Sequence, residues 1–233
     1  MKQIISFVFA LIVLSACHQI RGSGNIITEN RSTGDFTGVA AGGAFEVELK
    51  TGPNTEVRVE ADDNLMKYIE TNVSGNVLHI NTKEHTNFMD GHYKVYVTSP
   101  EINYVNSSGA ANIKIINTIK NSEKIKVEAS GAASVDGEVD APKITTEASG
   151  ASNITLSGRT MNYDAEASGS ATIKTEELMS ETTKVHASGA ANAHVYISVS
   201  LDADASGAAN IYYKGSGNIV KKTSGAANVK KDD

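Results

Sequence analysis

The sequence contains no tryptophan, three prolines and a single cysteine in 233 residues, and its charge is weighted toward acids. Lys and Arg number 21 against 27 Asp and Glu, and only four of these cations are arginines. A chain with this balance lacks the excess of Lys and Arg that binds a phosphate backbone, so nucleic acid is excluded as a partner. The lone cysteine, Cys17, also leaves the six histidines without a set of thiolates to share a zinc site.

The residues that are abundant favour a folded β protein. Hydrophobic residues make up 40% of the chain and charged residues 21%, which fits a soluble globular body and excludes a disordered chain or a polytopic membrane protein. The length allows one large domain or two small ones. Twenty glycines, with recurrent Ala, Ser, Asn, Ile and Val, favour many short strands joined by tight turns.

The N-terminus resembles the leader of a bacterial lipoprotein. Lys2 precedes an apolar stretch over residues 4–14, which is too short for a mature membrane span but typical of a signal-peptide core. Leu14-Ser15-Ala16-Cys17 follows directly and resembles the box whose cysteine is lipidated and becomes the mature N-terminus. We predict a signal peptide over residues 1–16 and a lipid anchor on Cys17 that attaches the protein to a membrane. A secreted protein with a leftover thiol, or an uncleaved anchor, fits less well.

A Ser-Gly pair recurs seven times in the second half of the chain. The glycines are separated by 22, 19, 19, 20, 18 and 18 residues, and they are Gly109, Gly131, Gly150, Gly169, Gly189, Gly207 and Gly225. A period of about 19 residues is too short for a pair of helices and suits one coil of a β-solenoid. Small side chains flank each glycine, so we expect them to stack on one another.

Two columns of residues follow each glycine and prefer opposite environments. The fourth residue after each glycine is nearly always Ile or Val, at positions 113, 135, 154, 173, 193, 211 and 229, and the third is Asn, Ser or Thr. Successive strand residues point to opposite faces, so the apolar column should face inward and the Asn column outward or into a turn. A column of Asn side chains can form a hydrogen-bonded ladder. A second strand precedes each Ser-Gly pair, for example residues 124–129, where Ile125 and Val127 alternate with polar residues.

These patterns predict an all-β chain built as a single parallel β-helix or β-solenoid, with right-handed coiling favoured. Residues 17–25 are typical of a flexible lipidated tether, and residues 106–233 form the repeat solenoid. Residues 26–105 lack the repeat but alternate like strands, so they should form a β-rich N-terminal layer continuous with the solenoid. Asp62 to Glu70 is the exception, because helical spacing behind Asp62-Asp63-Asn64 predicts a short capped helix there.

The order of several motifs resembles the head GIN domain family of auto-transporter adhesins, which are lipoproteins of Bacteroidetes. The motifs are the Cys17 box, Gly24-Asn25-Ile26, Phe36-Thr37-Gly38-Val39, Phe45-Glu46-Val47, Asp62-Asp63-Asn64-Leu65 and the Ser-Gly-Ala-Ala-Asn-Ile blocks. The resemblance covers about residues 24–229 and implies a β-helix-like body. The adhesin label is an analogy to β-helical surface heads, and the family defines no catalytic residue that could be carried over.

The resemblance also bears on localisation. In Bacteroidetes, acidic residues just after the lipidated cysteine are associated with export to the cell surface, and residues 18–24 contain none. An aspartate directly after the cysteine, the enterobacterial signal for inner-membrane retention, is also missing. We therefore expect attachment to the outer membrane, with the periplasmic side favoured over the cell surface.

Few residues suggest chemistry. The histidines form no His-Glu-x-x-His arrangement, and Glu84, His85, Asp90 and His92 could meet across one loop, although a solvated hairpin tip at Asp90-Gly91 explains them as well. Calcium-binding Gly-Gly-x-Gly-x-Asp repeats are absent from the sequence. We predict no metal site and no cofactor.

Paired carboxylates are the enzyme alternative, because many parallel β-helices act on polysaccharides. Asp202 and Asp204 share one strand face, and Asp136 and Glu138 nearly do, but alternating acids on a strand more often form its solvated face. The abundant serines lack a Gly-x-Ser-x-Gly elbow. Because the Ser-Gly serine recurs in seven stacked copies, we interpret it as structural and not as a catalytic nucleophile. We therefore predict that the protein is not an enzyme.

Binding is the function class that the patterns favour. A solenoid presents flat faces with ladders of Ser, Thr, Asn and Lys, which suit a glycan or an extended protein surface. Tyr212 or Tyr213 could stack on a sugar ring, although alternation turns one of them inward. The leading hypothesis is a lipid-anchored, adhesin-like protein that binds a glycan or an envelope or host protein. The rivals are a periplasmic structural or envelope-stress lipoprotein and, third, a polysaccharide-active enzyme.

Overall fold

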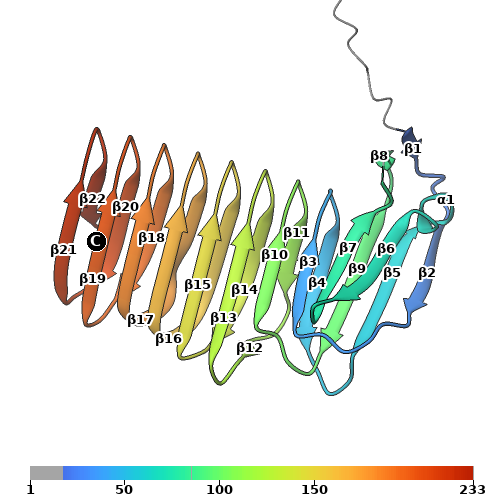
Figure 1. Ribbon diagram of the computed structural model, residues 1–233, viewed down its shortest axis with the longest axis horizontal. Coiled ribbons are helices and arrows are strands. Elements are labelled where there is room, and N and C mark those ends of the chain that lie inside the picture. The colour runs from blue at the N-terminus through green and yellow to red at the C-terminus, as the bar shows by residue number, and fades with distance from the viewer. Residues whose placement is uncertain (1–17, 85, 233) are drawn as a thin grey trace, which may run out of the picture.

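The computed structural model describes residues 18–84 and 86–232 and shows a rod of stacked parallel coils (Figure 1). Twenty strands form one continuous sheet, and two further strands form a separate small pair. The predicted all-β parallel solenoid is therefore confirmed, and the N-terminal layer is continuous with it. No helix among the described residues is long and apolar enough to cross a membrane.

Each coil contributes one strand to each of two opposite faces. Face A holds the strands that follow the Ser-Gly turns: β4 (Glu46–Thr51), β11 (Asn112–Ile115), β14 (Ser134–Asp140), the first halves of β16 (Asn153–Ala167) and β17 (Thr172–Ala187), β18 (Asn192–Ile197), β20 (Asn210–Gly215) and β22 (Asn228–Lys231). Face B holds the strands that precede these turns: β3 (Gly38–Ala41), β10 (Tyr104–Ser107), β13 (Lys124–Ala129), β15 (Lys143–Ala148), the second halves of β16 and β17, β19 (Ser200–Ala205) and β21 (Asn218–Thr223). A two-residue strand, β12 (Ile119–Lys120), lies at the bend between the faces and pairs with β14.

The Ser-Gly turns form one edge of the rod through a ladder of backbone hydrogen bonds. Every glycine of the column has φ between +72° and +75°, a conformation that side chains with a Cβ rarely adopt. The residue after each glycine donates its N–H to the glycine carbonyl of the preceding coil, for example Ala190 to Gly169 at 2.7 Å. The glycine is required for space as well, since a Cβ on Gly169 would lie 2.9 Å from the carbonyl oxygen of Gly150.

The ladder has one member more than the sequence pattern showed. Gly43 has φ +73° and accepts the N–H of Ala110, and β3 and β4 pair in register with β10 and β11. Gly42 occupies the place of the serine in this first copy, so the copy has a Gly-Gly pair and lacks the Ser-Gly pair of the others. The division expected between residues 105 and 106 falls inside β10.

The inward column forms the core, as predicted. All members from Ile113 to Ile211 are buried, and only Val229 in the last coil is partly exposed. The Asn column points outward and forms part of the expected ladder, because Asn210 donates to Asn192 at 3.2 Å and Asn228 donates to Asn210 at 3.3 Å. Tyr213 is the inward member of its pair, at 8% exposure, and Tyr212 faces outward.

Antiparallel strands form a cap, here called the N-terminal cap, over the N-terminal end of the core. β7 (Val77–Thr82) and β9 (Tyr93–Ser99) add one parallel layer to β3 and β4. β6 (Ile69–Ser74) then pairs antiparallel with β7, and β5 (Glu56–Asp62) pairs antiparallel with β9. β2 (Ile26–Arg31) pairs antiparallel with the other edge of β5. These reversals end the parallel stack (Figure 1).

Two sequence expectations for this end were wrong in detail. The helix α1 spans only Asp63–Met66, and Asp62 makes no side-chain cap to it, because the Asp62 carboxylate instead binds backbone N–H groups of other segments. Residues 18–25 are not a free tether in this structure. β1 (His18–Arg21) pairs in parallel with β8 (Thr86–Asp90), and residues 22–25 are hydrogen-bonded to the cap.

The glycine column generates a stability prediction. Gly169→Ala should lower the free energy of unfolding by about 2 kcal/mol or more, since the left-handed backbone alone costs an alanine roughly 1–2 kcal/mol and the new Cβ also crowds Gly150. Gly34→Ala is the matched control, because Gly34 is exposed and has no atom within 4 Å of its added Cβ. Chemical denaturation followed by circular dichroism measures both, and equal stabilities for the two variants would contradict the role of the column.

Candidate functional site

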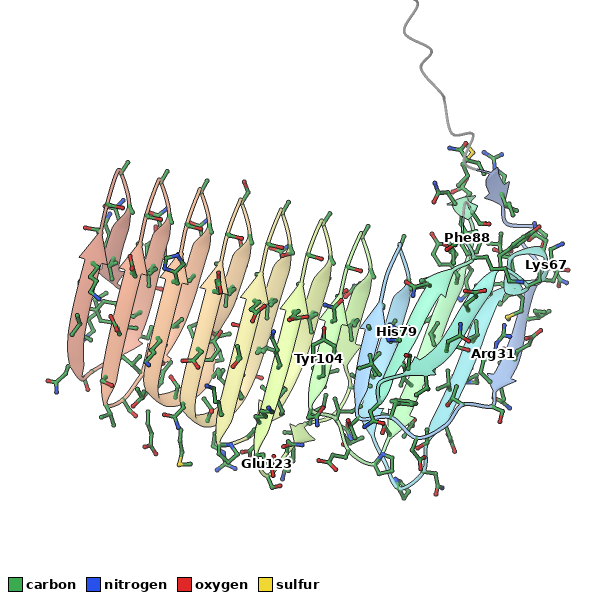
Figure 2. The ribbon with its side chains drawn as sticks, viewed as in Figure 1. Arg31, Lys67, His79, Phe88, Tyr104 and Glu123 are labelled. Carbon is green, nitrogen blue, oxygen red and sulfur yellow. The ribbon has the colours of Figure 1, made fainter. Side chains whose placement is uncertain are left out.

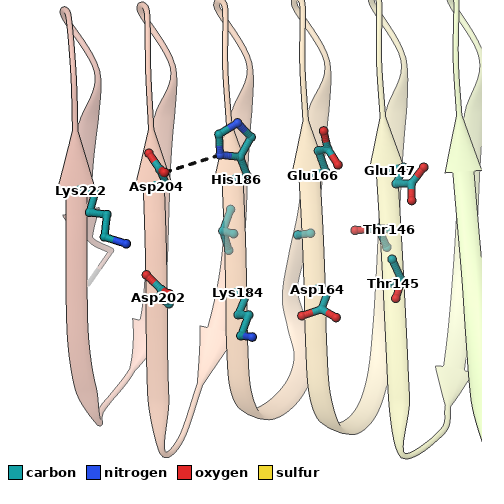
Figure 3. A pocket seen from close by; sticks show the side chains of 12 residues that line it. Thr145, Thr146, Glu147, Asp164, Glu166, Lys184, His186, Asp202, Asp204 and Lys222 are labelled. Carbon is teal, nitrogen blue, oxygen red and sulfur yellow. Dashed lines mark ion pairs between the residues drawn. The ribbon is translucent and has the colours of Figure 1, made fainter.

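A groove on face B brings together charged side chains from five consecutive strands. It encloses about 290 Å³ and runs from β15 across β16, β17 and β19 to β21 (Figure 3). Two outward columns line it. The column nearer the Ser-Gly edge, here called the carboxylate column, contains Glu128, Glu147, Glu166, His186, Asp204 and Lys222.

The second column carries charges of both signs and one uncharged residue. Its members are Lys126, Thr145, Asp164, Lys184 and Asp202, which lie on the same strands two residues before the carboxylate column. Parallel in-register pairing sets successive members roughly 4.8 Å apart. The groove therefore presents two parallel rows of side chains with a regular spacing along the rod.

Asp202 and Asp204, the acids singled out in the sequence, both line this groove. Asp202 is exposed, and Asp204 is half-buried, with its carboxylate 3.9 Å from His186 Nδ1 (Figure 3). Lys184 neighbours Asp202 in register on the adjacent strand. Both carboxylates thus lie in a solvated groove beside the cationic side chains of Lys184 and Lys222.

A network around Glu128 lies beside the end of the groove nearer the N-terminus and reaches the groove through Glu147. The Glu128 carboxylate accepts hydrogen bonds from Tyr104 Oη at 2.5 Å and Asn106 Nδ2 at 2.8 Å, and Lys126 Nζ bridges it to Glu147. Partial burial acts to raise the pKa of Glu128, but these hydrogen bonds outweigh it and lower the pKa to about 2. Burial and the neighbouring carboxylate raise the pKa of Tyr104 to about 12.

The other acid pair, Asp136 and Glu138, lies on face A. Both residues line a second cavity of about 440 Å³ with Lys174, Glu176 and Glu177. They thus lie on the opposite face from Asp202 and Asp204, and the sequence-predicted acids form two separate groups.

His92 and Asp90, two of the residues considered for a metal, face different partners. His92 Nε2 lies 2.7 Å from Glu60 Oε1, whereas Asp90 faces Arg21 at 3.7 Å, and His85 lies outside the described residues. Asp90-Gly91 is also not a hairpin tip, since β8 pairs with β1 and not with β9. Within residues 18–84 and 86–232, no three His, Cys, Asp or Glu side chains are grouped to hold a metal ion.

Face A carries an aromatic pair that the sequence reasoning missed. The rings of His194 and Tyr212 stack with centroids 4.8 Å apart and an interplanar angle of 20°. They occupy equivalent positions of successive coils, beside the Asn192–Asn210 ladder. Their separation of 18 residues equals the local coil length and could have identified the pair. Cys17, the predicted lipidation site, lies outside the described residues.

Comparisons with known proteins place this geometry in a family. The chain matches the family described as "Putative auto-transporter adhesin, head GIN domain" over residues 35–217. No match was found among curated proteins.

Solved structures share the fold at low sequence identity. A putative adhesin from Bacteroides fragilis is 22% identical with a TM-score of 0.85, and the alignment covers 91% of this chain and 100% of that one. A putative lipid binding protein from Parabacteroides distasonis gives 20% identity and a TM-score of 0.77, covering 92% and 100%. A putative adhesin from Parabacteroides merdae gives 18% identity and a TM-score of 0.76, covering 93% and 100%.

The Glu128 network predicts a pH-dependent stability. Because the folded pKa of Glu128 is lowered, its contribution is present above the ordinary carboxyl pKa and is lost as the pH falls toward 2. Glu128→Gln should therefore cost about 2 kcal/mol of unfolding free energy at neutral pH and little near pH 2. Chemical denaturation across this pH range measures it, with Glu166→Gln in the same column as the control. A loss that is independent of pH would contradict this assignment.

Proposed function

We propose a non-enzymatic binding role in the cell envelope for this chain, which belongs to the head GIN domain family of auto-transporter adhesins. The observation that carries the proposal is the groove on face B, where two columns of mostly charged side chains are aligned in register from coil to coil. A repeated, solvated row of hydrogen-bonding groups suits an extended ligand with its own repeat better than a small substrate.

The chemistry of the groove favours a glycan or an extended protein segment. The exposed carboxylates of Glu166 and Asp202 accept hydrogen bonds from hydroxyl, amide or ammonium groups, and Lys184 donates to acidic ones. Single contacts of this exposed kind are weak. Their repetition over five strands supplies affinity through many simultaneous contacts, as expected for an adhesin-like surface.

The same proposal includes the anchor and the compartment. The signal-peptide pattern over residues 1–16 and the Leu14-Ser15-Ala16-Cys17 box support lipidation of Cys17 after removal of the leader. We place the body at the outer membrane, with the periplasmic side favoured because residues 18–24 lack acids. A protein held there would bind envelope glycans or proteins, and the membrane contact would run through the lipid.

Charge-neutral substitutions in the groove test the proposed binding role. The mature chain is screened against arrays of bacterial envelope glycans and envelope proteins, and Glu147→Gln/Glu166→Gln is compared with Asp136→Asn/Glu138→Gln on the opposite face. The groove variant should weaken binding about tenfold, because two charge-assisted hydrogen bonds are lost and each exposed one contributes roughly 0.5–1 kcal/mol. The control variant makes an equal change in charge and should bind as the parent does.

Two results would count against this assignment. Weaker binding of only the face A variant would move the ligand to the opposite face. Turnover of a polysaccharide that Asp202→Asn/Asp204→Asn abolishes would replace the binding role with an enzymatic one.

A further inference from the structure

The segment that follows Cys17 is clasped to the N-terminal cap by one buried carboxylate. Asp62, at 2% exposure, accepts the N–H of Gly24 at 2.6 Å and the N–H of His92 at 2.7 Å. It thereby joins three segments: the chain before β2, the end of β5 and the start of β9. Gly22 packs against the same carboxylate, since an added Cβ there would lie 2.3 Å from Asp62 Oδ2.

The next two residues complete this clasp. Asp63 accepts hydrogen bonds from Ser23 Oγ at 2.6 Å and Asn25 Nδ2 at 2.9 Å, and these bonds lower the pKa of the Asp63 carboxyl. Asn64 accepts the N–H of Ser23 at 3.0 Å and donates to the carbonyl of Arg21 at 2.8 Å. Asp62-Asp63-Asn64 therefore holds residues 21–25 through at least five side-chain hydrogen bonds, where the sequence alone suggested a helix cap and a free tether.

Ahead of the clasp, β1 and β8 form a two-stranded ribbon beyond the main sheet. The ribbon projects on the same side of the rod as the Ser-Gly turns (Figure 1), and Phe88 on β8 lies at the opposite edge from Glu123 (Figure 2). Phe88 anchors the ribbon by packing edge-on against Tyr93, with ring centroids 5.0 Å apart. The next residue, Met89, is 60% exposed, the highest value among the exposed large apolar residues of the described chain.

The surface around the ribbon combines basic residues and a tyrosine with the exposed acids Glu84 and Asp90. Lys83 is exposed, the Lys67 ammonium lies 5.0 Å from the ring of the half-buried Tyr68, and Arg21 faces the Asp90 carboxylate at 3.7 Å. The Lys83 N–H bonds to the Tyr68 carbonyl, so these residues adjoin β8. Basic residues and tyrosine favour the level of lipid headgroups, and methionine can enter the apolar layer beneath them.

We propose that the β1–β8 ribbon is a membrane-contact surface that holds the rod in a fixed orientation on the bilayer. The inference rests on the proposed lipidation of Cys17. Cys17 is bonded to His18, the first residue of β1, and successive Cα atoms are about 3.8 Å apart, so the lipid must enter the bilayer beside the ribbon. Since the clasp fixes the ribbon to the cap, the bilayer surface constrains the whole solenoid and turns the Ser-Gly edge toward the membrane.

Fluorescence quenching at single introduced thiols tests the contact. In the lipidated protein purified from cells, Cys17 is blocked by its lipid, so Met89→Cys or Glu123→Cys carries the only free thiol. Each variant is labelled with an environment-sensitive fluorophore and reconstituted into phosphatidylethanolamine and phosphatidylglycerol vesicles that contain a nitroxide-labelled lipid. The label at position 89 should be quenched several-fold more strongly than the label at position 123, which is also exposed but lies at the opposite edge.

Loosening the clasp supplies the matched control. Ser23→Ala/Asn64→Ala in the Met89→Cys background removes exposed clasp contacts without touching the core, so the protein should stay folded and vesicle-bound while the quenching at position 89 falls. Equal quenching at positions 89 and 123 in a vesicle-bound, lipidated protein would overturn the contact. An intact mass without lipid would instead refute the anchoring on which the inference rests, and the two failures are thus distinguishable.

Discussion

The whole rod depends on the close approach of one glycine to the next along the Ser-Gly edge. Each glycine stands in a left-handed conformation, and the N–H of the residue after it reaches the glycine carbonyl of the preceding coil, at 2.6–2.7 Å along the entire column. A Cβ at any of the seven glycines from Gly109 to Gly225 would meet that carbonyl oxygen at 2.6–2.9 Å. The column therefore sets the spacing of the coils and fixes which residue of one coil lies above which residue of the next.

Register at this edge determines both the core and the surface. It places Ile154 over Val135 and Ile173 over Ile154 inside the rod, and by the same alternation it aligns Glu128, Glu147 and Glu166 outside. Differences in coil length are absorbed away from face B. The 22-residue step accommodates β12 at the bend between the faces, and the 20-residue step accommodates a register shift between Thr155 and Ser157 on face A. The groove is thus a consequence of a fold whose irregularities are kept away from face B.

The repeat half could be predicted from the sequence because its interactions recur at a fixed spacing. The inward column, the outward Asn column and the burial of one of Tyr212 and Tyr213 all follow from alternation within a strand, and the structure shows that the buried one is Tyr213. The N-terminal half could not be predicted in the same way, since its partners are far apart in sequence. Asp62 binds Gly24 and His92, and no local signal distinguishes these long-range bonds from a helix cap. The first coil could not be recognised from the Ser-Gly repeat, because Gly42 replaces the serine of the motif.

Deletion of one whole coil tests most directly the claim that the glycine column sets the register of the solenoid. Removal of residues 190–207 joins Gly189 to Ala208 and brings β20 onto β17, where the carbonyl of Tyr212 replaces that of His194 as acceptor for Thr175 Oγ1. Each coil contacts its neighbours alone, so the shortened chain should keep its β-sheet circular dichroism and unfold in one cooperative transition. Loss of the sheet signal, or a broad non-cooperative transition, would show that the coils are not interchangeable units and would contradict the account.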